Sequence, residues 1–312
     1  MCSDVSSLWI KRDDATHFRY GGNKVRKLEY LLADACRMQA RRIVTVGAAG
    51  SHHVLATAFH GIDAGFKVAA LLTPMPFSRH ALDNLGYALT LGLTAYPCSS
   101  ITRLPFEFAR TRRPGDYFIP PGGSSITGSM GYADAALELE RQVLSGEVPE
   151  PDSIVVALGS GGTVAGLLAG LEETSLRCSV HAVRVVPWPM ISGGYVEMLA
   201  RAVSYRRSRQ KERSGIGSVP LRRRCRLCVV GDRLGRGYGF GTVWGDEAIA
   251  RARSVGLELE ATYTAKAFSH ALRLVDGGRA GNVLYWHTLS GSCCGGLGGG
   301  IARELDMLWI RD

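Results

Sequence analysis

Residues Ser153–Gly170 read SIVVALGSGGTVAGLLAG, and this stretch decides the fold because it joins a strand to a helix through a glycine turn. Ser153–Leu158 is an apolar, β-branched run, which is typical of a buried strand. Small residues in succession let neighbouring backbone N–H groups face one anion, and the start of the next helix adds its dipole. The turn is therefore a candidate phosphate-binding loop, and it consists of Gly159, Ser160, Gly161, Gly162 and Thr163.

Two familiar phosphate-loop motifs do not fit this turn. The dinucleotide pattern G-x-G-x-x-G, counted from Gly159, needs glycine at position 164, where the chain has Val164. The Walker pattern also fails, because no Lys-Ser/Thr pair follows the glycines at the right place. The turn thus favours a small phosphorylated ligand without a nucleotide, and a glycine turn that serves only helix–sheet packing remains the alternative.

The same alternation of strand and helix continues along the chain. Segments with apolar residues at helical spacing separate short strand-like runs, as Leu28, Leu31, Leu32 and Ala35 illustrate. This order predicts an α/β fold with parallel sheets and helices on their faces, and ligands bind at the carboxyl ends of such strands. The expected strands are Leu8–Ile10, Arg42–Val46, Lys67–Leu72, Thr94–Tyr96, Ser153–Leu158, Val180–Val186, Cys225–Val230 and Asn282–Trp286.

Length and charge restrict the class of protein. The chain has 312 residues, 46% of them hydrophobic, which is enough for one large domain or two modest ones. We find no signal-peptide pattern and no apolar run of membrane-spanning length, so we expect a soluble, cytoplasmic protein. The net charge of +9 is concentrated in residues 201–226, which hold ten Lys/Arg and one acid. We interpret this basic segment as a solvated helix and loop; nucleic-acid binding is less favoured, because no nucleic-acid motif accompanies it.

Cysteine and histidine usage does not favour a metal site. Eight cysteines are scattered along the chain, which favours free thiols. Cys225 and Cys228 form a C-x-x-C pair, but a zinc site normally needs a second pair of ligands. Residues three apart on a strand face opposite sides, so we interpret this pair as structural. His52 and His53 are adjacent on a predicted helix and diverge, so we expect no metal there.

A second motif, YGGNKVRKLEY at Tyr20–Tyr30, places three cations at the start of a predicted helix, against the helix dipole. A lysine amine must be neutral to attack a carbonyl, and desolvation and nearby positive charge both favour that state. Lys24, with Arg26 and Lys27 beside it, is therefore a candidate nucleophile. A phosphate loop together with an activated lysine suggests pyridoxal 5′-phosphate held as a Schiff base. A surface lysine is the alternative for Lys24, and Arg26 is expected to be a surface or interface charge.

The motifs KRDD, YGGNKVRKLEYLLADA, VGAAGSHHVLATA, VVALGSGGTVAGL, GRGYG, ATYTAKA and LYWHTLSG occur in an order that resembles one enzyme family. It is the D-cysteine desulfhydrase and 1-aminocyclopropane-1-carboxylate deaminase family of fold-type-II pyridoxal-phosphate enzymes. The resemblance runs from about Leu8 to Gly296. It implies a tryptophan synthase β-like, two-domain, three-layer αβα fold, and suggests a homodimer. The expected large domain comprises residues 1–26 and 133–312, and the small domain comprises residues 27–132.

The resemblance also implies how the cofactor is held. Lys24 resembles the Schiff-base lysine, and Lys27 resembles a lysine that helps to bind the cofactor phosphate. Gly159–Thr163 resembles the main phosphate loop. Thr288 occupies the position at which a side chain approaches the pyridine nitrogen. His52 replaces an asparagine that the family carries beside the phenolic oxygen of the cofactor.

Four residues are carried over as catalytic. Ser51 falls where the family has a serine near the substrate, and Tyr238 and Tyr263 match two active-site tyrosines. With Lys24, these groups can move the protons that bond cleavage at the α- or β-carbon requires. Without the resemblance, the two tyrosines would be an ordinary strand-end residue and a turn aromatic.

Two positions separate the family's activities. The deaminases resemble one another in having Tyr-Glu and His-Leu where this chain has Tyr263-Thr264 and His287-Thr288. Threonine at both positions resembles the desulfhydrases, so we expect elimination from D-cysteine or a similar small D-amino acid, giving pyruvate, ammonia and sulfide. Deamination of aminocyclopropane carboxylate is the second reading. His52 and Leu289-Ser290 depart from the family, so a pyridoxal-phosphate-fold protein that binds ligand without turnover is the third.

Overall fold

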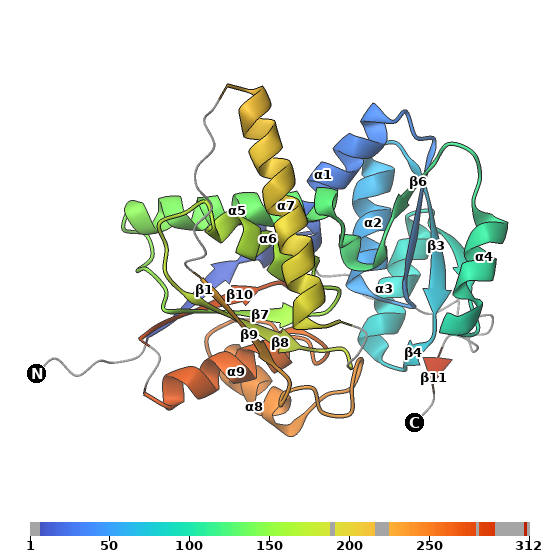
Figure 1. Ribbon diagram of the computed structural model, residues 1–312. Coiled ribbons are helices and arrows are strands. Elements are labelled where there is room, and N and C mark those ends of the chain that lie inside the picture. Colours follow the sequence, from blue (N-terminus) through green and yellow to red (C-terminus); the bar gives the residue numbers. More distant parts are fainter. Residues whose placement is uncertain (1–6, 188–190, 216–224, 279–280, 291–308, 311–312) are drawn as a thin grey trace, which may run out of the picture.

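The computed structural model describes residues 7–187, 191–215, 225–278, 281–290 and 309–310. Its larger sheet has five parallel strands in the order β1-β10-β7-β8-β9 (Figure 1). The non-sequential order means that crossover connections join the strands, as expected when helices alternate with parallel strands. The five strands are β1 Ser7–Arg12, β7 Ser153–Leu158, β8 Ser179–Arg184, β9 Arg226–Val230 and β10 Asn282–His287.

A smaller parallel sheet has four strands in the order β5-β3-β2-β6. Its strands are β2 Arg42–Ala48, β3 Lys67–Thr73, β5 Thr94–Pro97 and β6 Asp116–Ile119. Near this sheet, a short strand β4 at Met75–Pro76 pairs with β11 at Trp309–Ile310 (Figure 1). Residues close to the end of the sequence therefore contact the part of the fold that follows β3.

Helices cover both faces of each sheet, so the α/β prediction with parallel sheets is confirmed. On the larger sheet, buried side chains of α5, α6 and α7 pack against one face, and those of α8 and α9 pack against the other. On the smaller sheet, α1, α2 and α3 lie on one face and α4 on the opposite face. The helices are α1 Asn23–Arg37, α2 His52–Asp63, α3 Arg79–Thr90, α4 Leu104–Thr111, α5 Ile126–Leu144, α6 Gly162–Leu171, α7 Gly193–Arg213, α8 Val243–Arg253 and α9 Thr264–Asp276; short 3₁₀ turns lie at Asp13–Ala15, Ile101–Arg103 and Pro121–Gly123.

All eight expected strands are present, with ends shifted by up to two residues. The sequence pattern did not predict β6 or the short strands β4 and β11. β6 is only four residues long, and it lies at the edge of the smaller sheet, where it pairs with β2. The domain boundaries at 26/27 and 132/133 stay a prediction.

The helix after the glycine turn is held in place by close packing. A Cβ atom at Gly166 of α6 would lie 2.2 Å from the carbonyl oxygen of Ser129 in α5. No side chain fits in that space without moving one helix away from the other. Glycine in this stretch therefore serves helix packing as well as the turn, so the packing alternative accounts for part of the pattern.

The basic segment is only partly a solvated helix. Arg207 on α7 is 7% exposed, and its guanidinium contacts Glu173 at 2.6 Å and Asp134 at 2.7 Å. Lys211, one turn later, contacts Glu173 at 2.7 Å. These cations neutralise acids on neighbouring elements, which the local sequence could not show. Residues 216–224, with three of the segment's arginines, lie outside the described residues.

None of the described helices combines the length and the apolar character that a membrane crossing would require.

Candidate active site

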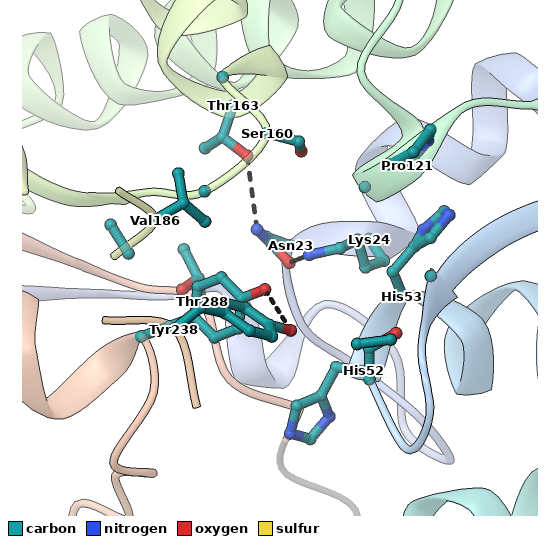
Figure 2. Close-up of a pocket in the computed structure, with 18 of the residues that line it drawn as sticks. Asn23, Lys24, His52, His53, Pro121, Ser160, Thr163, Val186, Tyr238 and Thr288 are labelled. Atoms are coloured by element: carbon teal, nitrogen blue, oxygen red, sulfur yellow. Dashed lines mark hydrogen bonds between the residues drawn. The ribbon is translucent and has the colours of Figure 1, made fainter. Parts of the chain in front are cut away.

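A cavity of about 390 Å³ lies where the carboxyl ends of strands from both sheets meet (Figure 2). Its wall contains residues from the start of α1, the turn after β2, the glycine turn after β7 and the end of β10. Nearly all the residues that the sequence analysis singled out therefore come together. Lining residues from that set are Lys24, Lys27, Ser51, His52, Gly159, Ser160, Gly161, Thr163, Tyr238, Tyr263 and Thr288.

The glycine turn forms one side of the cavity. Gly161 has φ 88°, a left-handed conformation that glycine adopts without strain, and it is the N-cap of α6. The hydroxyl groups of Ser160 and Ser124 lie 2.7 Å apart, and Thr163 sits in the first turn of the helix. Gly162 is not among the residues that line the cavity, and its N–H donates to Ser124 Oγ at 2.9 Å. The turn thus presents helix N–H groups and hydroxyls toward the cavity, which suits an anion.

Lys24 is the second residue of α1, and its side chain reaches into the cavity (Figure 2). Its Nζ donates to the Asn23 side-chain oxygen at 2.6 Å. Burial lowers the pKa of Lys24 from 10.5 to about 8, although the carboxylate of Glu260 acts in the opposite direction. Lys24 is therefore uncharged far more often near neutral pH than an ordinary lysine, and the neutral form is the one that a nucleophile or base requires.

Lys27 lies one helical turn beyond Lys24 and is 2% exposed. Its Nζ donates to the carbonyl oxygen of Gly122 at 3.0 Å. Burial, followed by the charge of Lys24, lowers the pKa of Lys27 well below its ordinary value. Two buried amines at one end of the cavity favour a negatively charged ligand, because an anion would remove their mutual repulsion and stabilise their charged forms.

Tyr238 and Tyr263 form a hydroxyl pair opposite the lysines. Tyr263 donates its O–H to the Tyr238 oxygen at 3.0 Å, and the rings meet edge to face with centroids 5.7 Å apart. Burial raises the pKa of both phenols, so both stay protonated at neutral pH. Tyr238 therefore has a hydrogen to donate to a group in the cavity, because its oxygen already accepts one from Tyr263.

Two charged residues that the sequence analysis did not select position these tyrosines. Glu260 accepts backbone N–H groups of Thr262, Tyr263 and Thr264 at 2.7 Å each, which fixes the start of α9. Lys266 is fully buried and donates to the carbonyls of Leu234 and Gly237, at 2.9 and 2.8 Å, just before Tyr238. Glu260 lies only three residues before Tyr263, whereas the loop that Lys266 holds is about thirty residues away in sequence.

The turn after β2 places Ser51 and two histidines at the base of the cavity. Ser51 is the N-cap of α2 and accepts the Val54 N–H at 3.3 Å. His52 contacts the Tyr20 hydroxyl at 3.0 Å and the His80 ring at 2.8 Å, whereas His53 contacts Thr45 at 2.8 Å. The two imidazoles diverge, as predicted. Burial, His80 and Lys24 together lower the pKa of His52 to about 3, so His52 is neutral.

Thr288 and Leu289 follow β10 and line the cavity. Leu289 is 8% exposed and adds a bulky side chain to the pocket wall. The sequence analysis had not selected Asn23, His53, Pro121 or Gly122, which also contribute to the wall. Asn23 belongs to the GGNK motif, and its side-chain N–H donates to Thr163 Oγ1 at 3.4 Å. The local sequence could not show this contact, because the two residues are 140 positions apart.

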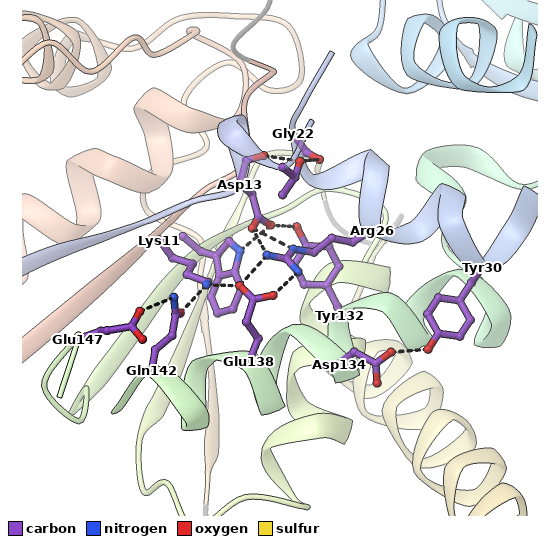
Figure 3. Close-up of polar contacts among 12 residues, drawn as sticks. Lys11, Asp13, Gly22, Arg26, Tyr30, Tyr132, Asp134, Glu138, Gln142 and Glu147 are labelled. Atoms are coloured by element: carbon purple, nitrogen blue, oxygen red, sulfur yellow. Dashed lines mark hydrogen bonds and ion pairs between the residues drawn. The ribbon is translucent and has the colours of Figure 1, made fainter. Parts of the chain in front are cut away.

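Arg26 is not a surface charge, and that prediction was wrong. Its guanidinium contacts the fully buried Asp13 at 2.9 Å and Glu138 at 2.8 Å (Figure 3). Burial disfavours the charge of Arg26, but the two carboxylates outweigh it and raise its pKa. Asp13 also accepts the Trp286 indole N–H at 2.7 Å and the Tyr132 hydroxyl. This network joins α1 to the larger sheet and to α5.

The network reaches Lys24 through the backbone. The main-chain oxygen of Asp13 accepts the N–H of Gly22 at 2.7 Å, and Gly22 is the N-cap of α1. Asn23 N–H donates to the Thr288 carbonyl at 3.3 Å. The first turn of α1 is thus fixed from two sides, which holds Lys24 at the cavity.

Comparison with known proteins gives a consistent answer. The family model described as "Pyridoxal-phosphate dependent enzyme" matches residues 3–288. A D-cysteine desulfhydrase of Salmonella choleraesuis (strain SC-B67) is 35% identical over 298 residues, which cover 90% of this chain and 86% of that protein. A solved structure of an ACC deaminase homologue has a TM-score of 0.72 at 28% identity and covers 93% of this chain and 86% of that one.

A fungal L-serine ammonia-lyase from Rhizomucor miehei shares the fold alone, with a TM-score of 0.60 at 16% identity over 91% of this chain and 89% of that one. The fold is therefore the tryptophan synthase β-like fold of pyridoxal-phosphate enzymes. The chain belongs to the pyridoxal-phosphate-dependent enzyme family, within the group of D-cysteine desulfhydrases and ACC deaminase homologues.

Proposed function

We propose that this protein is a lyase that eliminates the β-substituent of a small D-amino acid, with D-cysteine as the model substrate and pyruvate, ammonia and sulfide as products. The observation that carries this proposal is the pair of threonines in the cavity wall, Thr264 and Thr288. By the family resemblance, Thr264 is neutral where the deaminases have Glu, and Thr288 is polar where they have Leu. Thr264 Oγ1 accepts the Glu260 N–H at 2.7 Å. The similarity to D-cysteine desulfhydrases supports the same choice.

The residues of the cavity fit pyridoxal phosphate. Gly159–Thr163 offers helix N–H groups and hydroxyls to the phosphate, and Lys27 lies near enough to line the same cavity. Lys24 offers a partly neutral amine to the aldehyde. When bound, the cofactor would withdraw electrons from the α-carbon of the substrate. A neutral Thr288 near the ring nitrogen would not enforce its protonation, which suits loss of a good leaving group.

The protein's own groups supply the proton transfers. Lys24, with a pKa near 8, can take the α-proton when it is free of the cofactor. Tyr238, held by Tyr263, can donate its proton to the departing sulfur. Ser51 stands at the N-terminus of α2, where backbone N–H groups attract a carboxylate, so we assign it to the substrate end of the site.

A spectrum and a substrate panel test the proposal. Purified protein with pyridoxal phosphate should show a visible absorption band that Lys24→Ala abolishes and that Lys67→Ala, on the exposed start of β3, leaves unchanged. Sulfide and pyruvate should form from D-cysteine. Deamination is the alternative that the ACC deaminase homologue structure supports. Release of 2-oxobutanoate from aminocyclopropane carboxylate without sulfide from D-cysteine would favour it, and cofactor binding without either product would favour the non-catalytic reading.

We also propose a homodimer, as the family resemblance suggests. Light scattering of the cofactor-loaded protein should give a mass near twice the 33.6 kDa of the chain. A mass near that of the single chain would contradict it.

A further inference from the structure

Two cysteines at the amino ends of neighbouring strands lie in contact. Cys178 precedes β8 and Cys225 precedes β9, and their sulfur atoms are 3.4 Å apart. The strands pair in register from Ser179 opposite Arg226, and the Arg226 N–H donates to the Cys178 carbonyl at 3.2 Å. The two cysteines are therefore direct neighbours across the ladder, which is the separation that a disulfide between adjacent strands can span.

Their surroundings are apolar and restrict access to one side. Cys178 is 7% exposed and belongs to the core cluster under α5, α6 and α7, whereas Cys225 packs against that cluster and is partly exposed. Cys225 also contacts the Leu176 carbonyl at 3.5 Å. A small reagent can thus reach Cys225 first, with Cys178 directly behind it.

The two sulfurs differ in acidity. The contact with Cys178 lowers the pKa of Cys225, although burial acts in the opposite direction. The same contact and burial raise the pKa of Cys178. Of the two sulfurs, the more exposed one therefore has the lower pKa and forms the reactive thiolate more readily than its partner.

We propose that Cys178 and Cys225 form a redox-active pair that a hydroperoxide oxidises to an intrachain disulfide. The Cys225 thiolate attacks the peroxide oxygen, the O–O bond breaks, and after protonation Cys225 is a sulfenic acid and an alcohol or water has left. Cys178 then gives up its proton and attacks the Cys225 sulfur, which releases water. Two thiols lose two electrons in total, and one hydroperoxide gains them. A thiol reductant reverses the change by exchange.

The C-x-x-C motif is not this pair. Cys228 lies within β9 opposite His181, three residues from Cys225, so its side chain faces the other side of the sheet. The C-x-x-C motif thus contains one cysteine of the pair, Cys225, whereas the partner, Cys178, lies 47 positions away along the chain. Cys228 consequently serves as a matched control for substitution.

The cross-link would act on an edge strand. Among the described residues, β9 pairs with β8 alone, and the chain continues from β9 through residues 231–237 to Tyr238. Because parallel strands share a direction, the cysteines lie at the end of the sheet opposite the cavity. Closing a chain loop of this length should raise the thermal midpoint by about 5 °C.

Mass spectrometry of the cofactor-loaded protein tests the pair. After brief treatment with a few equivalents of hydrogen peroxide, a non-reducing digest should contain the Cys178 peptide joined to the Cys225 peptide, and the count of reactive thiols should fall by two. Dithiothreitol should reverse both changes. Cys228→Ser should behave like the wild type, whereas Cys225→Ser should show no Cys178 cross-link and no rise in the thermal midpoint.

Cys178→Ser adds a second readout that does not depend on stability. Without its partner, Cys225 should be found as sulfinic or sulfonic acid under the same treatment, while the wild type resists that overoxidation. If the wild type shows equal overoxidation at Cys225, or if Cys225 is linked to Cys228, the proposal is wrong. This test is independent of the enzyme activity proposed above.

Discussion

Replacing Asp13 with asparagine should destabilise the fold strongly, although it exchanges only a carboxylate oxygen for an NH₂ group. Asp13 is fully buried and accepts three side-chain hydrogen bonds, from Arg26, Tyr132 and Trp286. An amide keeps one acceptor oxygen and directs an NH₂ group at donors. In this variant Arg26 still pairs with Glu138, and its side chain is 15% exposed to solvent. Its charge is therefore only partly left without a partner. Breaking a buried pair costs about 3–5 kcal/mol, and we expect about 3 kcal/mol for Asp13→Asn.

Urea unfolding, followed by tryptophan fluorescence, measures this loss. The midpoint should fall while the slope with urea stays the same, because the change affects stability and not the surface exposed on unfolding. Asp14→Asn is the matched control, since Asp14 contacts Arg12, whose side chain is 55% exposed and can return to water. We expect it to cost at most about 1 kcal/mol. A loss below about 1 kcal/mol for Asp13→Asn, or equal losses for both variants, would refute the role of the network.

Three further predictions concern the site and its support. The rate at which Lys24 reacts with pyridoxal phosphate should rise with pH up to about 8 and then level off, and a flat stopped-flow profile from pH 6 to 9 would contradict its pKa. Burial opposes the charge of Glu138, but bonds from Arg26 and Lys11 lower its pKa from 4.5 to about 2, so it stabilises the fold above pH 4.5 and less as pH falls toward 2. In Glu138→Gln, the urea midpoint should therefore depend less on pH between pH 5 and 3 than in the wild type. An unchanged pH dependence of the midpoint would contradict the lowered pKa of Glu138. Tyr263→Phe should lower kcat about 100-fold with an unchanged cofactor spectrum. Full activity of this variant would exclude a role of the hydroxyl pair in proton transfer.

Much of the fold could be predicted from local sequence. Strands such as Ser153–Leu158 are continuous apolar runs, and the spacing of Leu28, Leu31 and Leu32 marks a helix without reference to the rest of the chain. β6 could not be recognised in this way, because its four residues become a strand only through pairing with β2. The local sequence pattern thus predicts long helices and strands, whereas a short edge strand depends on its tertiary contacts.

The candidate site was predictable where its residues lie in strand-to-helix turns, because parallel topology gathers those turns at one edge. Arg26 could not be interpreted from its neighbours, since its partners are 13 and 112 positions away. Lys266 was missed for the same reason, because its role depends on a loop that folds back onto α9. The partners of Glu260 are local, since it accepts N–H groups only two to four residues further along the chain. When such a charged side chain is buried, it holds neighbouring segments in place through hydrogen bonds and ion pairs. Whether it is buried depends on the whole fold and not on the local sequence.

The close contact between Gly166 and the Ser129 carbonyl bears on how this protein can change by mutation. Alanine at position 166, although it favours helix, would push α6 away from α5 and carry the attached phosphate loop with it. A saturation library scored for cofactor retention should therefore be nearly empty at position 166, while hydroxyl positions in the loop tolerate exchange of serine and threonine. The side of α6 that packs against α5 would then tolerate fewer substitutions than the phosphate loop, although it does not line the cavity.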